Sequence, residues 1–336
     1  MATQHAVAVR EQPLVSVAMV TYNHQSYIAQ AIEGVLAQHT TFSVELIVTD
    51  DHSTDGTAMI INDLAKQHKS LIKPVLREQN VGSMANFVDT LKRCKGKYVA
   101  ICDGDDYWTD PDKLQKQVAF MEGNPDYAIC AHPTELQEGE VKRSYPNEYL
   151  AKDGELLISD LAAGNLFYTS SVLYRNGLFE QFPEWINRSP VGDYVLHMLN
   201  ARKGKLKYLP DTMSVYRKHG GGIWNATPMA EVLEKWLLVL DLLMSEEFEP
   251  SIKIILQQQR MDAADGLLQF LLKFQPAEFI HKFKTLTVQD EVLEGRWLDK
   301  LINDARDYME VKPRYQSLKR SRCRKYLSYI FPQLKM

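Results

Sequence analysis

The sequence predicts an α/β protein with a doubly wound, mixed but mainly parallel sheet that helices cover on both faces. Val- and Ile-rich runs, typical of fully buried strands, recur between residues 14 and 102. Segments with apolar residues at helical spacing separate these runs. Polar clusters follow the strands, as is usual where an open α/β sheet binds its ligand.

The first strand is expected at 14–20, where LVSVAMV has the composition of a strand buried on both faces. Tyr27, Ile28, Ala31 and Ile32 follow it at the spacing of one helical stripe. The unit then repeats, because similar helical patterns separate three further apolar runs. These further strands are expected at 44–49, 72–76 and 98–102.

Pro74 lies inside the third expected strand. Proline has no amide hydrogen and deletes a hydrogen bond from the ladder, so this strand is expected to lie at an edge of the sheet or to carry an irregularity. The pattern weakens into a polar stretch at 132–165. Strands are expected again at 167–174 and 206–216, on either side of a helix near 191–202.

Strand signals stop after Pro228, and long stretches of Leu, Ala, Glu, Gln and Lys at helical spacing follow. Helices are expected at 229–245, 251–274 and 290–309. The predicted organisation is an α/β domain, a helical region and a basic amphipathic tail, at 1–228, 229–310 and 311–336.

The cysteine spacing and the lengths of the apolar stretches exclude several classes of protein. The four cysteines lack the spacing of a zinc site or a disulfide framework. The first residues have no apolar core of signal-peptide length, and the longest apolar stretch, 237–244, is too short to span a bilayer. These observations favour a cytoplasmic protein.

The tail carries eight Lys or Arg side chains and no acidic one, although the whole chain has a formal charge of −4. Tyr, Leu, Ile and Phe alternate with the basic residues, which favours an anionic membrane surface as its partner. A solvated basic helix or an oligomer contact is the alternative. Nucleic acid is disfavoured because the rest of the chain is acidic.

Acidic clusters follow the second and fourth expected strands, as Asp50-Asp51 and Asp103-Gly104-Asp105-Asp106. Neither a dinucleotide-binding glycine motif nor a P-loop occurs, so phosphate must be held in another way. Closely spaced carboxylates suit Mg²⁺ or Mn²⁺, which can neutralise a departing diphosphate. The alternative is that both clusters are solvated turns with helix caps.

Four segments resemble, in order and spacing, the motifs of glycosyltransferase family 2. They are VSVAMVTYNHQSYI, ELIVTDDHSTDGT, REQNVGSMANF and GKYVAICDGDDYWTDPDKL. The resemblance covers roughly residues 13–220 and implies the GT-A fold. It also implies an inverting, metal-dependent transfer from a nucleoside diphosphate sugar, commonly a UDP-sugar, to a glycan or lipid-linked acceptor, as in bacterial surface polysaccharide assembly.

Transfer of a single sugar is favoured, because the Q-x-x-R-W motif of processive synthases is absent. Position by position, the resemblance implies a set of residues that bind the donor nucleotide, with Asp51 accepting a hydrogen bond from the base. This set is Thr21, Tyr22, Asn23, Asp51, Arg77, Gly82, Asp103 and Asp105. His52 departs from the family, which usually has glycine there.

The resemblance further implies that Asp105, Asp106 and His219 hold the metal, as Mn²⁺ or Mg²⁺. Asp193, which directly precedes an amphipathic helix, corresponds to the catalytic base. The alternative for Asp193 is a helix cap, and that for His219 is an exposed loop histidine. As a whole, the chain could instead be a sugar nucleotidyltransferase or a non-catalytic nucleotide-sugar or glycan-binding module.

Overall fold

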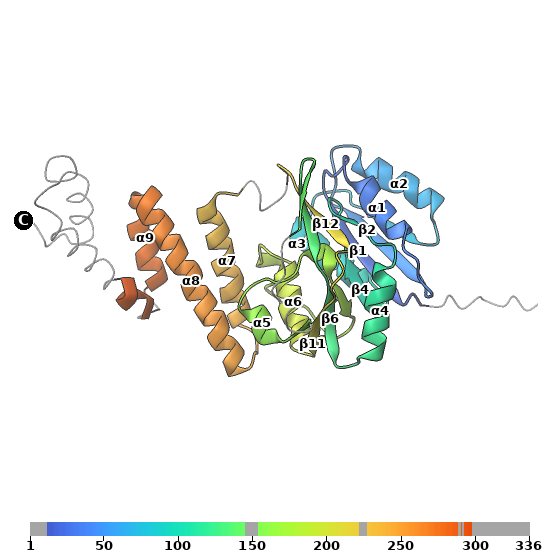
Figure 1. Ribbon diagram of the computed structural model, residues 1–336. Coiled ribbons are helices and arrows are strands. Elements are labelled where there is room, and N and C mark those ends of the chain that lie inside the picture. Colours follow the sequence, from blue (N-terminus) through green and yellow to red (C-terminus); the bar gives the residue numbers. More distant parts are fainter. Residues whose placement is uncertain (1–11, 145–153, 222–226, 288–289, 291, 298–336) are drawn as a thin grey trace, which may run out of the picture. The chain divides into compact units, whose positions relative to one another are not determined.

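The computed structural model describes residues 12–144, 154–221, 227–287, 290 and 292–297 (Figure 1). The chain divides into two compact units. The first contains the described residues before 222 and also Leu242–Leu256, and the second contains Thr227–Asp241 and the described residues from 257 onward. The second unit begins at Thr227, close to the domain boundary predicted at 228. Residues 242–256 of the predicted helical region, however, belong to the first unit.

Eight strands of the first unit form one sheet in the order β3-β2-β1-β4-β10-β6-β11-β9. The strands are β1 (Val15–Thr21), β2 (Val44–Asp50), β3 (Ile72–Leu76), β4 (Tyr98–Ile101), β6 (Tyr127–Ala131), β9 (Glu155–Leu156), β10 (Leu173–Arg175) and β11 (Lys205–Tyr208). The pairs β3-β2, β2-β1, β1-β4 and β6-β11 are parallel, and β10 and β9 are antiparallel to their neighbours. The predicted mixed, mainly parallel sheet is confirmed, and β3 with Pro74 lies at its edge.

Helices connect these strands and bury apolar stripes on the sheet. They are α1 (Ile28–Leu36), α2 (Thr57–Gln67), α3 (Ser83–Arg93), α4 (Lys113–Gly123), α5 (Ile158–Ala162) and α6 (Asp193–Ala201). Alternate residues of β1, such as Val17 and Met19, share one core with Ile32 of α1 and Leu114 of α4. Because side chains of β1 alternate between the two faces, helices can cover both faces of the sheet. The loops that can bind a ligand then lie at the carboxyl ends of the strands.

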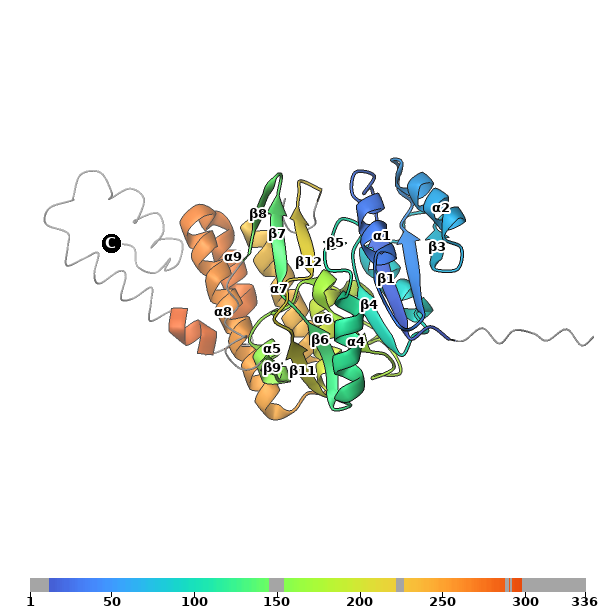
Figure 2. The same cartoon turned by 45° about the vertical axis from the view of Figure 1, so that its right-hand side comes forward.

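A second sheet has the order β5-β12-β7-β8 (Figure 2). Its strands are β5 (Tyr107–Trp108), β12 (Ser214–Lys218), β7 (Thr134–Glu138) and β8 (Val141–Arg143). The sequence does not predict a second sheet, because β5 has two residues and β8 is exposed throughout, so neither shows an apolar strand pattern. The strand expected at 206–216 is therefore wrong: a turn around Pro210 divides it between β11 of the first sheet and β12 of the second.

The strand expected at 167–174 is also shorter than predicted. A 3₁₀ turn at Thr169–Ser171 precedes β10. The hydroxyl of Ser171 donates to the carbonyl of Tyr168 at 2.7 Å, a local bond that competes with a strand ladder. This turn brings Thr169 close to the start of α6, where it contributes to the candidate site.

The helical region is confirmed by α7 (Met229–Met244) and α8 (Pro250–Phe274), and α9 (Pro276–Thr287) follows them. Within the second unit, Arg260 Nε lies 2.5 Å from Asp241 Oδ1. Phe279 packs against Trp297 with ring centroids 5.6 Å apart. Most of the helix expected at 290–309, and the whole tail at 311–336, lie outside the described residues. None of the described helices combines the length and apolar character needed to span a membrane.

Candidate active site

Parallel pairing places the loops after β1, β2 and β4 side by side at one edge of the sheet. Thr21 at the end of β1 pairs with Asp50, and the amide of Gly104 donates to the carbonyl of Val20 at 2.9 Å. The Thr21 hydroxyl is buried and has no hydrogen-bond partner among the described residues. Segments that are 29 and 84 residues apart in the sequence thus meet here, as expected at the carboxyl edge of such a sheet.

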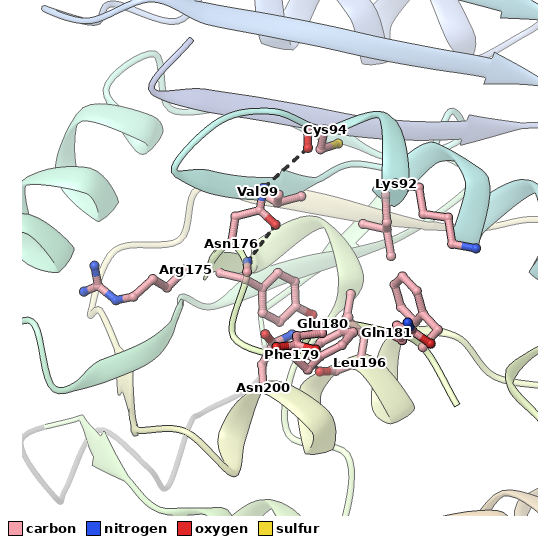
Figure 3. Close-up of a pocket in the computed structure, with 14 residues that line it drawn as sticks. Lys92, Cys94, Val99, Arg175, Asn176, Phe179, Glu180, Gln181, Leu196 and Asn200 are labelled. Atoms are coloured by element: carbon pink, nitrogen blue, oxygen red, sulfur yellow. Dashed lines mark hydrogen bonds between the residues drawn. The ribbon is translucent and has the colours of Figure 1, made fainter. Parts of the chain in front are cut away.

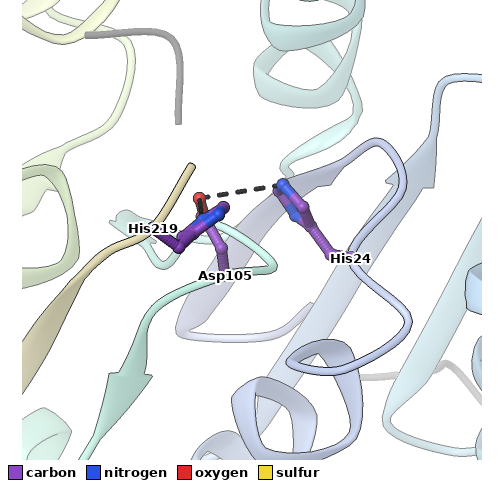
Figure 4. A group of neighbouring side chains, drawn as sticks. All are labelled: His24, Asp105 and His219. Carbon is purple, nitrogen blue, oxygen red and sulfur yellow. Dashed lines mark hydrogen bonds and ion pairs between the residues drawn. The ribbon is translucent and has the colours of Figure 1, made fainter. Parts of the chain in front are cut away.

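Asp105 lies between two histidines from different segments (Figure 4). Its Oδ2 atom is 3.1 Å from Nε2 of His219, which follows β12, and 3.7 Å from Nε2 of His24, which follows β1. One ligand atom from each of the three residues lies within 4.8 Å of the others. One carboxylate and two imidazoles form a donor set that transition-metal ions accept.

The surroundings of Asp105 favour its ionised carboxylate, and those of His24 favour its neutral imidazole. Burial alone would raise the pKa of Asp105, but the hydrogen bond from His219 and the charges of both histidines lower it. Burial lowers the pKa of His24 despite the attraction of Asp105. A neutral imidazole nitrogen is the form that binds a metal.

His24 was not among the residues predicted for the site. The signal was present in the sequence, because His24 follows Thr21-Tyr22-Asn23 at the end of the first strand. Pattern alone did not reveal that its ring would face Asp105, since that contact depends on how the loop after β1 turns. Asn23 makes this turn with a φ of 55°, a left-handed conformation that asparagine tolerates better than most residues.

Asp103 and Asp106 differ from Asp105 in their surroundings. Oδ1 of Asp103 is buried without a hydrogen-bond partner among the described residues. Burial, together with the charges of Asp105 and Asp193, holds the pKa of Asp103 well above its usual value. Asp106 is 2% exposed, and its Oδ1 accepts the backbone amide of Arg217 at 2.9 Å. Of the three predicted metal ligands, the structure therefore groups Asp105 with His219 and turns Asp106 toward β12.

Gly104 permits the close approach of the acidic segment to β1. A Cβ atom at this position would lie 2.7 Å from both Cβ and Oγ1 of Thr21, a distance that side-chain carbons do not adopt. The glycine between Asp103 and Asp105 is thus required by space, because the loop lies against the end of the first strand.

Asp51 fastens the loop between β3 and α3. Its two carboxylate oxygens accept the backbone amides of Val81 and Gly82 at 2.8 and 3.0 Å. Arg77 donates to Asn86 and Asp89, both at 2.7 Å, and so joins the same loop to α3. The predicted residues Asp51, Arg77 and Gly82 therefore do meet, as one hydrogen-bonded loop at the end of β2.

His52, the departure from the family pattern, has a φ of 63°. This left-handed conformation explains why glycine suits the position, because it carries no Cβ penalty. The ring of His52 forms a 3.2 Å hydrogen bond with the carbonyl of Arg77. This hydrogen bond helps to hold His52 in the left-handed conformation that glycine would adopt without strain.

Asn23 and Gln25 tie the loop after β1 to the loop after β2. Asn23 receives a hydrogen bond from the amide of Thr54 and donates its own amide to Ser53, both at 2.8 Å. The amide of Gln25 donates to Asp55 at 3.0 Å. Tyr22 is exposed beside this junction, so its ring is available to a ligand.

Asp193 is the first residue of α6, and Gly192 occupies the N-cap position. The carboxylate of Asp193 accepts hydrogen bonds from the Asn165 amide at 3.1 Å and from its neighbour Tyr194 at 2.7 Å. Thr169 lies 3.4 Å from the same carboxylate. Burial, the charge of Asp105 and the charge of Asp193 together raise the pKa of Asp103.

A cavity of about 480 Å³ lies elsewhere, between the end of α3, the start of β4 and β10 (Figure 3). Cys94, Val99, Tyr174 and Asn176 are among the residues that line it. Burial raises the pKa of the Cys94 thiol to about 12, so that this thiol stays protonated. None of the predicted site residues lines this cavity.

The family model of glycosyl transferase family 2 matches residues 16–189. An uncharacterized protein of Mycobacterium bovis is 40% identical over 214 residues, which are 63% of this chain and 60% of that protein. The putative teichuronic acid biosynthesis glycosyltransferase TuaG of Bacillus subtilis is 41% identical over 130 residues, which are 38% of this chain and 50% of TuaG. The chain therefore matches less than two thirds of the length of these relatives.

Among solved structures, TarS residues 1–349 of S. aureus in complex with UDP-GlcNAc is similar to this chain with a TM-score of 0.61. The alignment covers 84% of this chain and 83% of that chain at 19% sequence identity. At this level of identity the likeness shows a shared fold.

Proposed function

Because the chain belongs to glycosyl transferase family 2, we propose that it transfers a single sugar from a nucleoside diphosphate sugar to an acceptor hydroxyl. The observation that carries the proposal is the convergence of His24, Asp105 and His219 next to Asp103. His24 follows β1, Asp105 follows β4 and His219 follows β12. The loops after β1 and β4 lie at the edge where open α/β sheets bind ligands.

A divalent cation fits the residues at this edge. Asp105 and His219 would hold it, with His24 as a neighbouring donor, and Asp106 would stay bound to β12. The unpaired, buried Oδ1 of Asp103 supports a ligand in the same place. When bound, Mn²⁺ or Mg²⁺ would neutralise the charge of the diphosphate leaving group. Two imidazole donors favour Mn²⁺ of these two ions.

The donor nucleotide is proposed to bind between the loops after β1, β2 and β3. Thr21, Tyr22 and Asn23 line one side, and the loop fastened by Asp51, which contains Arg77 and Gly82, lines the other. Each oxygen of Asp51 accepts one amide and keeps lone-pair capacity for a hydrogen bond from the base. A UDP-sugar is the proposed donor, as the likeness to a UDP-GlcNAc complex supports.

Asp193 is the proposed general base. Its carboxylate takes the proton of the acceptor hydroxyl while that oxygen forms a bond to the anomeric carbon. The bond from this carbon to the diphosphate oxygen breaks, and the diphosphate leaves with the electron pair. Attack from the face opposite the diphosphate inverts the anomeric configuration. The hydrogen bonds from Asn165 and Tyr194 fix the direction in which the carboxylate points.

The similarity to TuaG supports a setting in surface polysaccharide assembly, with a glycan or lipid-linked acceptor. The basic tail at 311–336 lies outside the described residues, and its contact with an anionic membrane surface stays a prediction from the sequence.

The proposal is tested by incubating the full chain with a panel of UDP-, GDP- and dTDP-sugars and measuring the release of the nucleoside diphosphate. Slow hydrolysis of at least one donor is expected with Mn²⁺, with loss of the signal on addition of EDTA. Binding without any turnover, with or without an acceptor glycan, would instead indicate a non-catalytic binding module.

A further inference from the structure

Arg217 of β12 is buried at 7% exposure beside the acidic segment. Its guanidinium donates one hydrogen bond to the backbone carbonyl of Asp105 and another to the side-chain oxygen of Gln30 in α1. Its backbone amide donates to Asp106 Oδ1 at 2.9 Å. A single residue thus joins α1, the acidic segment and β12.

Two aromatic rings enclose the guanidinium. Its central carbon lies 4.3 Å from the ring centroid of Tyr107 and 5.1 Å from that of Tyr27. A planar cation between two aromatic faces is favoured electrostatically, and its orientation is fixed. Tyr27 in turn packs against His219, with ring centroids 4.7 Å apart.

The three segments that Arg217 joins carry or adjoin the three candidate cation ligands. His24 lies just before α1, Asp105 is in the acidic segment, and His219 lies two residues beyond Arg217. His219 follows directly after the end of β12, so the hydrogen bonds that hold Arg217 also limit where His219 can lie. Arg217 also supplies a positive charge where the carboxylates of Asp105 and Asp106 repel one another.

We propose that Arg217 is a positioning residue that holds Asp105 and His219 at the separation needed to bind a divalent cation. The inference rests on the proposed function, because it takes a cation to be what these two residues bind. Lysine cannot replace the arginine fully, because the guanidinium presents its donors in one rigid plane whereas an ammonium group is a compact point charge. The hydrogen bonds to Asp105 and Gln30 use two of the five N–H donors of the guanidinium and fix the direction in which it points.

The test measures Mn²⁺ binding by electron paramagnetic resonance of the free ion, with and without UDP. Arg217→Met should weaken Mn²⁺ binding about tenfold or more, an effect typical of losing the support of a ligand. Arg217→Lys should recover only part of this loss. Lys218→Met is the matched control, since it removes an exposed positive charge from the next position of β12 and should leave Mn²⁺ binding unchanged.

Gln30→Ala is the second variant, needed if Arg217→Met does not fold. Gln30 is on the surface, and its loss removes one acceptor of the guanidinium without opening a core. We expect Mn²⁺ binding to weaken about fivefold, in keeping with the loss of one ordinary hydrogen bond at the surface. The melting temperature, measured in EDTA, should stay within a few degrees of the wild type.

Unchanged Mn²⁺ affinity in Arg217→Met or Gln30→Ala would overturn the inference. Weakened UDP binding in EDTA, with normal Mn²⁺ affinity, would also overturn it and would show that Arg217 contacts the diphosphate. A wild-type chain that binds Mn²⁺ but turns over no donor would contradict the proposed function alone. A wild-type chain that binds no Mn²⁺ would remove both.

Discussion

His219 Nε2 lies 3.1 Å from Asp105 Oδ2, although 114 residues separate the two in the sequence. The contact joins the loop after β4 of the large sheet to the end of β12 in the second sheet. A cation bound to both residues would therefore link the two sheets. We therefore expect substitutions of either residue to weaken cation binding more than they lower the stability of the fold.

His219→Ala should weaken Mn²⁺-dependent binding of UDP by about 100-fold, because it removes one of the proposed protein ligands. Binding is measured by isothermal titration calorimetry of UDP in the presence of Mn²⁺. His39→Ala is the control, since His39 also pairs with an aspartate but is exposed and remote from the group of His24, Asp105 and His219. Equal binding by wild type and His219→Ala would remove His219 from the cation site.

Asp193→Asn should keep donor binding and lose transfer. The amide retains a similar shape but cannot take up the acceptor proton, and losing a positioned base costs about 10²- to 10⁴-fold in rate. The turnover number and the dissociation constant of the donor are measured separately. Asp126→Asn, which changes an exposed aspartate paired with Lys205, should leave both values unchanged. If Asp193→Asn turned over at the wild-type rate, another group would have to be the base.

Gly104→Ala should displace the acidic segment, because the new Cβ would lie 2.7 Å from the Thr21 side chain. Such overpacking costs about 1–3 kcal/mol of stability. We also expect weaker UDP binding in the presence of Mn²⁺, measured as a smaller thermal shift. Gly123→Ala is a matched control, because no atom lies within 4 Å of its added Cβ. A normal thermal shift in Gly104→Ala would show that the segment tolerates displacement.

The sequence predicted the first half of the fold well, because the apolar runs and helical stripes from Val15 to Ile101 are strong and regular. From Pro74 it predicted that β3 lies at an edge or carries an irregularity, and β3 does lie at an edge of the sheet. The family resemblance is confirmed by the match over residues 16–189. These features are local in the chain, so that short windows of sequence suffice to find them.

The remainder depends on contacts between distant segments. The second sheet pairs strands of two to five residues with little apolar pattern, and only their tertiary partners make them strands. The turn at Asn23 brings the ring of His24 close to Asp105. The carboxylate of Asp106 accepts a hydrogen bond from the backbone amide of Arg217. Asp105 and Asp106 are adjacent in the sequence and yet contact different partners, because successive residues of a loop can point in different directions.

Lys113 provides a prediction on stability. It is fully buried, donates to Gln117 at 2.7 Å and lies 4.1 Å from the ring centroid of Trp108. Burial lowers the pKa of Lys113 to about 7 in the folded chain, whereas a lysine in the unfolded chain keeps its ordinary pKa of 10.5. Above pH 7 the unfolded chain therefore binds more protons than the folded chain, and this contribution makes folding more favourable as the pH rises.

Between pH 7 and 9, the wild type should gain stability relative to Lys113→Met by up to about 1.4 kcal/mol per pH unit. The free energy of unfolding is measured by urea denaturation at each pH. Lys116→Met should follow the wild-type pH dependence, because Lys116 is exposed and charged in both states. Parallel curves for wild type and Lys113→Met would mean that the buried amine stays protonated through this range.

The proposed cation site is best tested by anomalous diffraction at the manganese absorption edge, from crystals of the full chain soaked with Mn²⁺ and UDP. We predict one strong peak in contact with Asp105 and His219, with the diphosphate beside it and the base between the loops that contain Tyr22 and Asp51. A well-bound UDP with no such peak, or a peak bound by other residues, would contradict the claim that these side chains form a cation site for the donor.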